Sequence, residues 1–488
     1  MKLPSLKSGL ALAALAPAFL AVAAPAWAAP TPEKADTAFM FLSTVLVLLM
    51  TIPGLALFYG GMVRAKNMLS VLMQVMAITC LIAVIWLVYG YSMAFTSGGA
   101  LNDYVGGFSK VFLAGVKADS TVATFSNGVV IYEYSFIAFQ MTFACITPAL
   151  IVGAFAERVK FSGLLVFCAL WVTFVYFPIA HMVWYWAGPD AIAEAAKAVA
   201  GASGDAKVKA QEALDAVLAD AGQIFKWGAI DFAGGTVVHI NAGIAGLVGA
   251  IVIGRRLGYA KEAMPPHSLT MTMIGASLLW VGWFGFNCGS NLEASGTAVL
   301  AMMNTFAATA AAGLAWMLAE WMAKGKPSLL GHDARREAGL VAVTPASGFA
   351  GPMGALLLGL VAGVICFIFC TSIKNSMGYD DSLDVFGVHC IGGIIGAIGT
   401  AVVANPDFGG TGIADYVSKP GELVVATYDM TAQIIAQSKA VLLTLVWSGG
   451  ISFVLFMLVK MTFGLRPAEE KEREGLDVTE HGERAYNY

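Results

Sequence analysis

Two histidines inside long apolar stretches are the residues of this 488-residue chain whose type and setting best suit chemistry. His239 and His389 lie 150 residues apart, and each follows a valine. Both are followed by glycines four, seven and ten residues later, namely Gly243, Gly246 and Gly249 and then Gly393, Gly396 and Gly399. An ionisable side chain deep in an apolar segment is costly and usually faces a cavity or a partner. The repeated pattern predicts an internal duplication that brings both imidazoles together.

The chemistry open to such a pair is limited to small, uncharged molecules. Neutral imidazole rings hydrogen-bond a small polar molecule and can pass a proton between them. They cannot compensate a cation, because moving an ammonium-sized ion into an apolar medium costs on the order of 20 kcal/mol before relaxation. For one buried histidine, a packing role is the usual explanation. The matched pair instead favours a narrow apolar pore lined by both rings.

An aspartate opens each histidine-bearing apolar segment. Asp231 precedes His239, and Asp384 precedes His389. A carboxylate at a helix N-terminus accepts hydrogen bonds from free backbone N–H groups and suits the helix dipole. We expect this structural role for Asp384. For Asp231 the sequence favours two roles equally, the same cap or a source of negative potential for an external cation site.

Aromatic residues and one serine recur at helical spacing in three other apolar segments. They are Phe139 and Phe143 in one segment, Trp184 at the end of the next, and Trp283, Phe286 and Ser290 in the third. Taken singly, each ring is an ordinary core or membrane-interface aromatic. Taken together, they can form a cation–π cup with a hydroxyl acceptor, above a pair of stacked phenyl rings. Such cation–π attraction contributes roughly 0.5–2 kcal/mol.

Composition indicates an all-α polytopic membrane protein. The chain is 58% hydrophobic and only 12% charged, with a mean hydropathy of +0.75. Runs of 18 or more largely apolar residues recur along it, and each can cross a hydrocarbon core of roughly 30 Å. The net charge of −4 gives no indication of a nucleic-acid partner. The seven cysteines show no metal-ligand spacing, so we expect neither a metal nor a cofactor.

The first 28 residues resemble a secretory signal peptide rather than a span. Two lysines precede an apolar stretch, and Ala26-Trp27-Ala28 offers a small-x-small cleavage site. The alternative is an uncleaved extra helix. Eleven spans follow, at 37–63, 68–96, 132–156, 161–186, 231–253, 268–289, 296–323, 334–350, 352–374, 384–404 and 435–463. With cleavage, the mature N-terminus is extracytoplasmic and the C-terminus cytoplasmic, in agreement with lysine and arginine in the loops predicted to be cytoplasmic.

Other motifs recur with the histidines. Ile146-Thr147-Pro148-Ala149 in the third span matches Val343-Thr344-Pro345-Ala346 in the eighth. Spans 1–5 and 6–10 therefore look like two copies. Because five is odd, the copies must insert in opposite orientations, as two five-helix inverted repeats plus a C-terminal eleventh helix. Residues 188–226 are predicted to be an extracytoplasmic helical excursion, to which we assign no chemistry.

The motifs at 139–147, 231–239, 283–287 and 384–389 closely resemble those of the ammonium transporter (Amt/Mep/Rh) family, in its bacterial Amt branch. The resemblance runs from about residue 37 to the end, which implies that 29–463 form the transport domain and 464–488 a cytoplasmic regulatory tail. It implies ammonium or ammonia transport in the bacterial inner membrane, with methylammonium as an analogue and no enzymatic activity. It further implies a homotrimer with one pore in each subunit.

By resemblance, each candidate residue receives a role. Ammonium is recruited outside, loses its proton near a phenylalanine gate and crosses as ammonia along the twin histidines. The residues are Trp184, Phe143, Ser290 and Asp231 for recruitment, Phe143 and Phe286 for the gate, and His239, His389, Phe139, Trp283, Ile146 and Val385 for the pore. The sequence does not decide between electroneutral ammonia transport and electrogenic transport of ammonium or of ammonia with a proton.

The tail also resembles the family, at Gly475, Asp477 and Tyr486. This implies docking of a trimeric PII (GlnK-like) signal protein that regulates transport. The alternative function is an ammonium sensor or PII-sequestering scaffold with little transport. Two features depart from the pattern of the resembled family. They are the charged stretch 331–337 at the start of the eighth predicted span and the length of the predicted excursion at 188–226.

Overall fold

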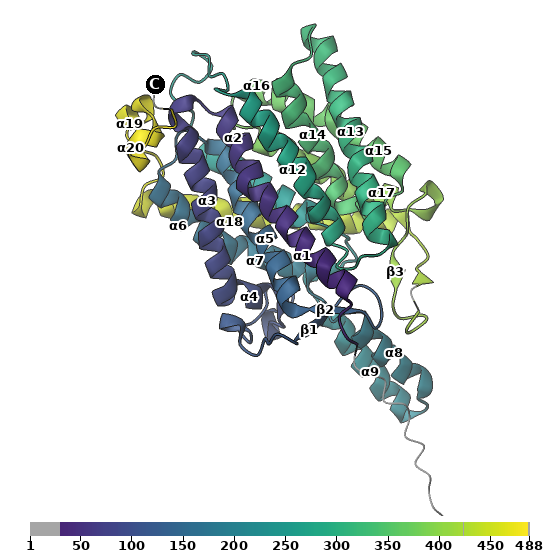
Figure 1. The fold of residues 1–488 in the computed structure, drawn as a ribbon. Helices are drawn as coiled ribbons and strands as arrows, with labels where there is room; N and C mark the ends of the chain where they lie inside the picture. Colours follow the sequence, from purple (N-terminus) through teal and green to yellow (C-terminus); the bar gives the residue numbers. More distant parts are fainter. Residues whose placement is uncertain (1–29, 423, 487–488) are drawn as a thin grey trace, which may run out of the picture.

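The computed structural model describes residues 30–422 and 424–486, except for the side chains of 330–336. The predicted signal peptide lies outside these residues, and so do most of the charged side chains at 331–337. Within the described part the chain is mainly helical, with two short β-hairpins, and the helices pack side by side in a bundle (Figure 1). The predicted all-α membrane class is confirmed.

Among the described residues, ten helical segments are long and apolar enough to span a membrane. Six of them contain kinks or π-helical turns. The segments are α1–η1–α2 (Lys34–Leu49, Met50–Leu55, Ala56–Met62), η2–α3–η3–α4 (Ala65–Asn67, Met68–Ile85, Trp86–Gly90, Tyr91–Phe95), α5–η6 (Glu133–Val152, Gly153–Phe155), α6–η7–α7 (Phe161–Trp171, Val172–Tyr176, Phe177–Trp184), η8–α11 (Gly235–Ile240, Asn241–Ile253), α12 (Leu269–Gly289), α13 (Gly296–Lys324), α15–η10–α16 (Pro352–Ile368, Phe369–Ile373, Lys374–Met377), η11–α17 (Phe386–Cys390, Ile391–Val403) and α18 (Met430–Thr462).

The remaining predicted span, 334–350, differs from the other ten. It forms the 15-residue helix α14 (Leu329–Val343), followed by a 3-10 turn, η9 (Thr344–Ala346). Charged residues occupy the first part of α14, so its apolar portion is too short to qualify as a span by itself. The segment is nevertheless internal, because Ala338–Ala346 are buried in the bundle.

The two ends of the bundle carry different structures. One end holds the antiparallel hairpins β1–β2 (Thr121–Ala123, Val130–Tyr132) and β3–β4 (Ala414–Asp415, Val424–Val425), together with helices α8–α10. The predicted excursion forms these helices, α8 (Pro189–Gly201), α9 (Asp205–Ala219) and α10 (Gln223–Lys226), and the α8–α9 pair projects from the bundle (Figure 1). The tail helices α19 (Glu469–Glu474) and α20 (Leu476–His481) lie at the opposite end.

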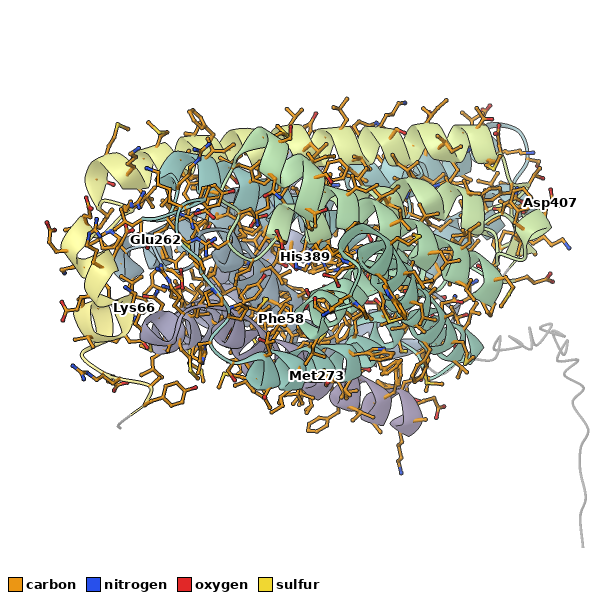
Figure 2. The ribbon with its side chains drawn as sticks, turned by 90° about the horizontal axis from the view of Figure 1, so that it is seen from above. Phe58, Lys66, Glu262, Met273, His389 and Asp407 are labelled. Atoms are coloured by element: carbon orange, nitrogen blue, oxygen red, sulfur yellow. The ribbon has the colours of Figure 1, made fainter. Side chains whose placement is uncertain are left out.

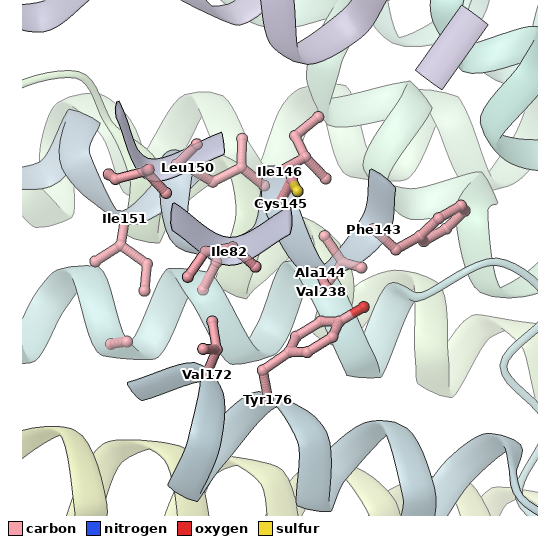
Figure 3. Close-up of a cluster of buried hydrophobic side chains, with 14 of the residues drawn as sticks. Ile82, Phe143, Ala144, Cys145, Ile146, Leu150, Ile151, Val172, Tyr176 and Val238 are labelled. Atoms are coloured by element: carbon pink, nitrogen blue, oxygen red, sulfur yellow. The ribbon is translucent and has the colours of Figure 1, made fainter. Parts of the chain in front are cut away.

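Helix α5 forms the centre of the bundle. In its most apolar window 78% of residues are buried, against 33% for α18 at the periphery. Figure 3 shows the reason, because Ile146, Leu150 and Ile151 of α5 lie among buried side chains from other segments, including Ile82 of α3 and Val172 of η7. A helix that is apolar all round is stable only when neighbouring helices or lipid surround it.

Glycines allow the two histidine-bearing segments to cross closely. A Cβ on Gly243 of α11 would lie 2.3 Å from the backbone nitrogen of Cys390 in η11. A Cβ on Gly393 of α17 would lie 2.8 Å from Ile240 Cγ1 in η8. Small residues permit such backbone approach between membrane helices. The glycines that follow each histidine therefore bring the opposite histidine's segment into contact.

Candidate functional site

The two histidines meet in the interior, as the duplicated motif predicts. Nδ1 of His239 and Nδ1 of His389 are 3.3 Å apart, and the ring centroids are separated by 5.4 Å at an interplanar angle of 15°. Both side chains are buried, and Figure 2 shows His389 midway between Lys66 near one end and Asp407 near the other. A hydrogen bond between two Nδ1 atoms requires one to donate and the other to accept, so the pair shares a single proton at that contact.

π-Helical turns contain both histidines. His239 lies in η8 and His389 in η11, and each turn passes directly into the α-helix that carries the three glycines. Such turns widen the helix by one residue and are frequent at functional sites. Nε2 of His239 has no hydrogen-bond partner among the described residues, although it is fully buried. A buried ring nitrogen of this kind is available to a small polar guest.

Aromatic rings line the His239 side of the pair. Trp283 stacks on His239 with centroids 5.4 Å apart at 19°, and Phe286 lies 6.0 Å from the same ring. Phe286 in turn stacks on Phe143 at 4.1 Å and 23°, and Phe139 packs on Phe143 at 4.9 Å. The two predicted gate phenyls are therefore in face-to-face contact next to the histidines.

The predicted recruitment residues also cluster. The Trp184 ring meets Phe143 edge-on, with centroids 5.9 Å apart at 86°. The Ser290 hydroxyl donates to the Phe286 carbonyl at 2.8 Å, which leaves its oxygen lone pairs free to accept. The Trp184 indole N–H donates to the Asp231 backbone carbonyl at 2.9 Å, which ties the recruitment cluster to the start of η8.

The Asp231 carboxylate is a helix cap. One of its oxygens accepts from the backbone N–H groups of Gly234 and Gly235 at 2.9 and 2.7 Å, and the other from Thr236 and Val237 at 2.8 and 3.1 Å. Four donors that lack intrahelical partners are thus satisfied by one side chain. Of the two roles open to Asp231, this geometry favours the structural one.

The cap predicted for Asp384 is wrong, because Asp381 performs it. The Asp381 carboxylate accepts from the N–H groups of Val385 and Phe386 at 3.1 and 2.8 Å. Asp384 itself has φ of +61° and pairs with Lys374, whose Nζ lies 2.6 Å from Asp384 Oδ1. The left-handed backbone at Asp384 turns its side chain away from the helix start. A signal was present, because Asp381 precedes His389 by eight residues, as Asp231 precedes His239.

An ion-pair network that we did not predict lies beside Asp381. It comprises Arg64, Glu157, Arg158, Arg256 and Asp380. Arg158 is fully buried and donates to the carbonyls of Gly254, Ala154 and Asp380 and to the Ser382 hydroxyl, so it joins the end of α5 to the loop before η11. Nothing in the local sequence marks this arginine, since its partners Gly254, Asp380 and Ser382 are 96, 222 and 224 residues away.

The carboxylates of this network are ionised. Burial by itself would raise the pKa of Glu157, but hydrogen bonds and charge from Arg64 outweigh it and hold that pKa below its ordinary value. Burial likewise opposes ionisation of Asp380, and two-point contact with the Arg256 guanidinium, at 2.8 and 3.0 Å, lowers its pKa overall. Paired buried charges of this kind fix geometry, because separating them leaves an uncompensated charge.

The other predicted residues fall into two groups. Ile146 of α5 is buried below Phe143 on the same helix, and Val385 is buried with its Cγ1 about 3.2 Å from a Cβ placed on Gly246. The tail residues contact the bundle: Asp477 Oδ1 accepts from the Ser70 N–H at 2.8 Å, and the Tyr486 hydroxyl lies 3.1 Å from His267 Nε2.

Gly475 is needed at its position in the tail. It has φ of +120°, and a Cβ there would lie 2.7 Å from the Lys66 backbone.

Across the described residues, no group of three or more histidine, cysteine, aspartate or glutamate side chains is arranged to hold a metal ion.

Known proteins resemble this chain in sequence and in fold. Residues 38–486 match the model of the Ammonium Transporter Family. An ammonium transporter from Bacillus subtilis is 41% identical over 93% of this chain and 99% of its own length, and one from Aquifex aeolicus is 39% identical over 93% and 94%.

Solved structures agree on the fold. Saccharomyces cerevisiae Mep2 superposes with a TM-score of 0.73 at 27% identity, covering 90% of this chain and 89% of its own. A Sensor Amt Protein gives a TM-score of 0.75 at 24% identity, covering 92% and 98%. The family model covers nearly the whole chain, and the relatives align over nearly their full lengths. The chain therefore belongs to the Ammonium Transporter Family.

Proposed function

We propose that this protein transports ammonium across a cell membrane by conducting ammonia past His239 and His389. The observation that carries the proposal is the buried contact between the two imidazoles, 3.3 Å between Nδ1 atoms, beside a stacked phenyl pair. The names of the full-length relatives, ammonium transporters, support this substrate. They also favour a transporter over an enzyme.

Recruitment takes place at Trp184, Phe143 and Ser290. The edge-on Trp184 and Phe143 rings attract a cation through their π faces, and the Ser290 oxygen accepts one of its hydrogen bonds. Asp231 supports the cluster by holding Trp184 through its carbonyl and by capping η8 with its carboxylate. Ammonium is favoured at this site because it carries both charge and hydrogen-bond donors.

Deprotonation takes place at the Phe143–Phe286 pair, and the proton passes either to external water at the recruitment cluster or to a ring nitrogen of the histidine pair. The phenyl rings offer no hydrogen-bond acceptor, so an ion leaving the recruitment cluster loses its ligands. The neutral molecule then meets Trp283, His239 and His389, with Ile146, Phe139 and Val385 as apolar wall. Ammonia can donate to or accept from a ring nitrogen there, whereas potassium finds no replacement for its hydration shell.

Assembly and regulation form a further part of the proposal. We infer a homotrimer in the bacterial inner membrane, with the mature N-terminus outside and the tail inside, and docking of a PII signal protein on the tail face. The contacts of Gly475, Asp477 and Tyr486 with the loop around Lys66 and with the adjoining segments support a tail that communicates with the transport domain.

Uptake by proteoliposomes tests the transport function. Vesicles holding the purified protein should accumulate methylammonium under an inward gradient and exclude potassium. His239→Ala should retain its oligomeric state in detergent but lose selective conduction, because one ring of the pair is gone. Undiminished, potassium-excluding uptake by that variant would refute the role of the twin histidines.

Two outcomes refine the mechanism. A current on a solid-supported membrane after an ammonium pulse would indicate that charge crosses the membrane, either as ammonium or as ammonia with a proton. The absence of a current would indicate net transport of ammonia. A wild-type protein that is folded and binds a PII protein but transports no methylammonium would favour the sensor or scaffold function instead.

A further inference from the structure

We propose that Thr344 is a positioning residue of the pore: its hydroxyl holds the Trp283 indole against the His239 ring, and this stack excludes hydrated cations. The inference rests on the proposed function and deepens it. It concerns the Thr-Pro motif of the second repeat, which sequence reasoning used only as a sign of duplication.

The first step is a single buried hydrogen bond. The Trp283 indole N–H donates to Thr344 Oγ1 at 3.0 Å. The threonine hydroxyl can donate to the Leu340 carbonyl at 2.7 Å, so its lone pairs are free to accept from the indole. An indole has one N–H and no acceptor, and burying it unpaired is unfavourable. The bond therefore fixes which way the Trp283 ring plane faces.

The next residue, Pro345, contacts the segment that leads to the other member of the stack, His239. A Cβ placed on Gly235, at the start of η8, would lie 2.6 Å from Pro345 Cδ, and the Phe232 N–H donates to the Pro345 carbonyl at 3.2 Å. Adjacent residues of η9 thus hold Trp283 on one side and the segment that carries His239 on the other. Their rigid linkage sets the spacing of the 5.4 Å Trp283–His239 stack.

A second layer of buried side chains supports Thr344. Its one hydroxyl proton is shared between the Leu340 carbonyl and Asn287 Oδ1, which lies 3.3 Å from Thr344 Oγ1, and the Asn287 amide donates to the Thr305 hydroxyl at 2.9 Å. Thr305 in turn donates to the Ala301 carbonyl at 2.7 Å. All three side chains are buried, so the chain of bonds runs from the pore to helix α13 without exposure to solvent. A buried hydrogen-bond network of this kind restrains the ring that it ends on.

Selectivity follows from the rigidity of that ring. The Trp283 face covers one side of the His239 ring, so an indole held in this position keeps water away from that side of the ring. If the indole turns, water enters, and a potassium ion can then keep part of its hydration shell. Loss of the Thr344 hydroxyl should therefore weaken potassium exclusion before it affects folding.

The test compares two substitutions of one residue. Thr344→Val is isosteric and removes only the hydroxyl, whereas Thr344→Ser retains it. We measure methylammonium uptake and potassium flux in proteoliposomes and report their ratio, because a lower amount of folded protein reduces both fluxes equally. The control is Thr400→Val, which removes another buried threonine hydroxyl that donates only within its own helix, to the Gly396 carbonyl at 2.7 Å.

We expect the potassium-to-methylammonium ratio to rise at least tenfold in Thr344→Val and to stay within twofold in Thr344→Ser and Thr400→Val. An unchanged ratio in Thr344→Val, or equal ratios in the valine and serine variants, overturns the proposal. Trp283→Phe removes the donor from the other side and must also raise the ratio. An unchanged ratio in that variant overturns the proposal even if Thr344→Val does not fold.

The double variant completes the test. In the Trp283→Phe background, Thr344→Val should add no further change, because the bond is already absent. Independent, additive effects would contradict a shared role. If the wild-type protein itself fails to exclude potassium or to take up methylammonium, the proposed function fails. If the wild type succeeds and Thr344→Val behaves like it, only this inference fails.

Discussion

The two copies of the histidine motif share a backbone but have different surroundings. On the His239 side, Trp283, Phe286 and Phe143 form a continuous set of ring contacts, and the Asp231 carboxylate accepts four N–H groups. On the His389 side, Asp381 accepts two N–H groups.

The ring contacts differ in the same way. Among the described residues, His389 has no aromatic contact other than His239. The ion-pair network of Arg64, Glu157, Arg158, Arg256 and Asp380 adjoins this side instead. Duplication therefore repeated the turn that places an imidazole at mid-depth, while the residues around each copy diverged into an aromatic side and a charged side.

The largest expected difference concerns the two caps. Asp231→Ala leaves four N–H groups without acceptors, each at about 1–3 kcal/mol, and should lower methylammonium uptake by about 100-fold or more per inserted protein. Asp381→Ala leaves two and should lower it by roughly 30-fold, at about 1 kcal/mol for each N–H group. Asp231→Asn and Asp381→Asn each keep one acceptor oxygen, so the uptake of each should lie between that of wild type and that of the corresponding Ala variant. Equal losses for Asp231→Ala and Asp381→Ala would contradict the difference between the caps.

The next largest expected difference is in stability, between the first glycine after His239 and the first glycine after His389. In Gly243→Ala the new Cβ meets the Cys390 backbone nitrogen at 2.3 Å, which cannot move aside, and the free energy of unfolding should fall by about 1–3 kcal/mol. In Gly393→Ala the nearest atom is Ile240 Cγ1, at 2.8 Å, and the backbone atoms Gly235 O and Ile240 N lie at 3.0 and 3.1 Å. These contacts are less tight than the 2.3 Å contact in Gly243→Ala, and the loss should be about 1 kcal/mol.

Thermal unfolding in detergent measures this difference between the glycines. Gly450→Ala is the control, since no atom lies within 4 Å of the added Cβ. A Gly393→Ala protein that melts earlier than Gly243→Ala would reverse the comparison.

A smaller effect is expected for the phenylalanines. Phe286→Leu breaks the 4.1 Å stack on Phe143, and such aromatic pairs contribute about 0.5–1.5 kcal/mol. Discrimination between methylammonium and potassium should fall about two- to tenfold. The Phe386 ring centroid lies 6.1 Å from that of Tyr379 and 6.5 Å from that of Phe369, so its ring contacts are looser. In Phe386→Leu the discrimination between methylammonium and potassium should therefore stay within about twofold of wild type. If flux measurements showed the same loss of discrimination in Phe386→Leu as in Phe286→Leu, the His389 side would also contain a gate.

The smallest effect concerns acid stability on the charged side. The pKa of Glu157 is held below its ordinary value, so its contribution is present above the unfolded pKa of about 4.3 and is lost as pH falls through the lower folded value. At pH 7 the free energy of unfolding of Glu157→Gln should be about 1 kcal/mol lower than that of wild type, so the variant should melt at a lower temperature. This difference in melting temperature should disappear in acid. In the control Glu469→Gln, whose ion pair with Arg473 is exposed, the melting curves should match wild type. A gap that persists in acid would contradict ion pairing as the cause.

Hydropathy and spacing predicted most of this architecture. Ten of the eleven predicted spans are found, because a run of apolar residues long enough for a bilayer has few alternatives to a helix. The segment 334–350 fell short because charged residues occupy the start of α14. The meeting of His239 and His389 was also predictable, since one motif repeated in two crossing helices places its copies at equivalent depth.

Local pattern failed where contacts cross the chain. The cap was assigned to Asp384 because it lies nearest the apolar run, yet its left-handed backbone directs it to Lys374 and leaves Asp381 to cap the turn. Arg158 looks like an ordinary loop cation until the chain folds and brings Gly254, Asp380 and Ser382 to its guanidinium group. Thr344 reads as a repeat marker until Trp283 donates to it.

Sequence alone therefore determined the membrane class, the duplication, the identity of the paired histidines and the aromatic set beside them. The membrane class and the duplication follow from hydropathy and from repeated motifs, which act over single helices, whereas the aromatic set beside the histidines was implied by the resemblance of its motifs to a known family. Only the tertiary structure decided which carboxylates cap, which arginine joins the halves and which hydroxyl orients the indole. Those choices depend on the directions of side chains from separate helices, and hydrogen bonds lose their strength within a few tenths of an ångström of misplacement.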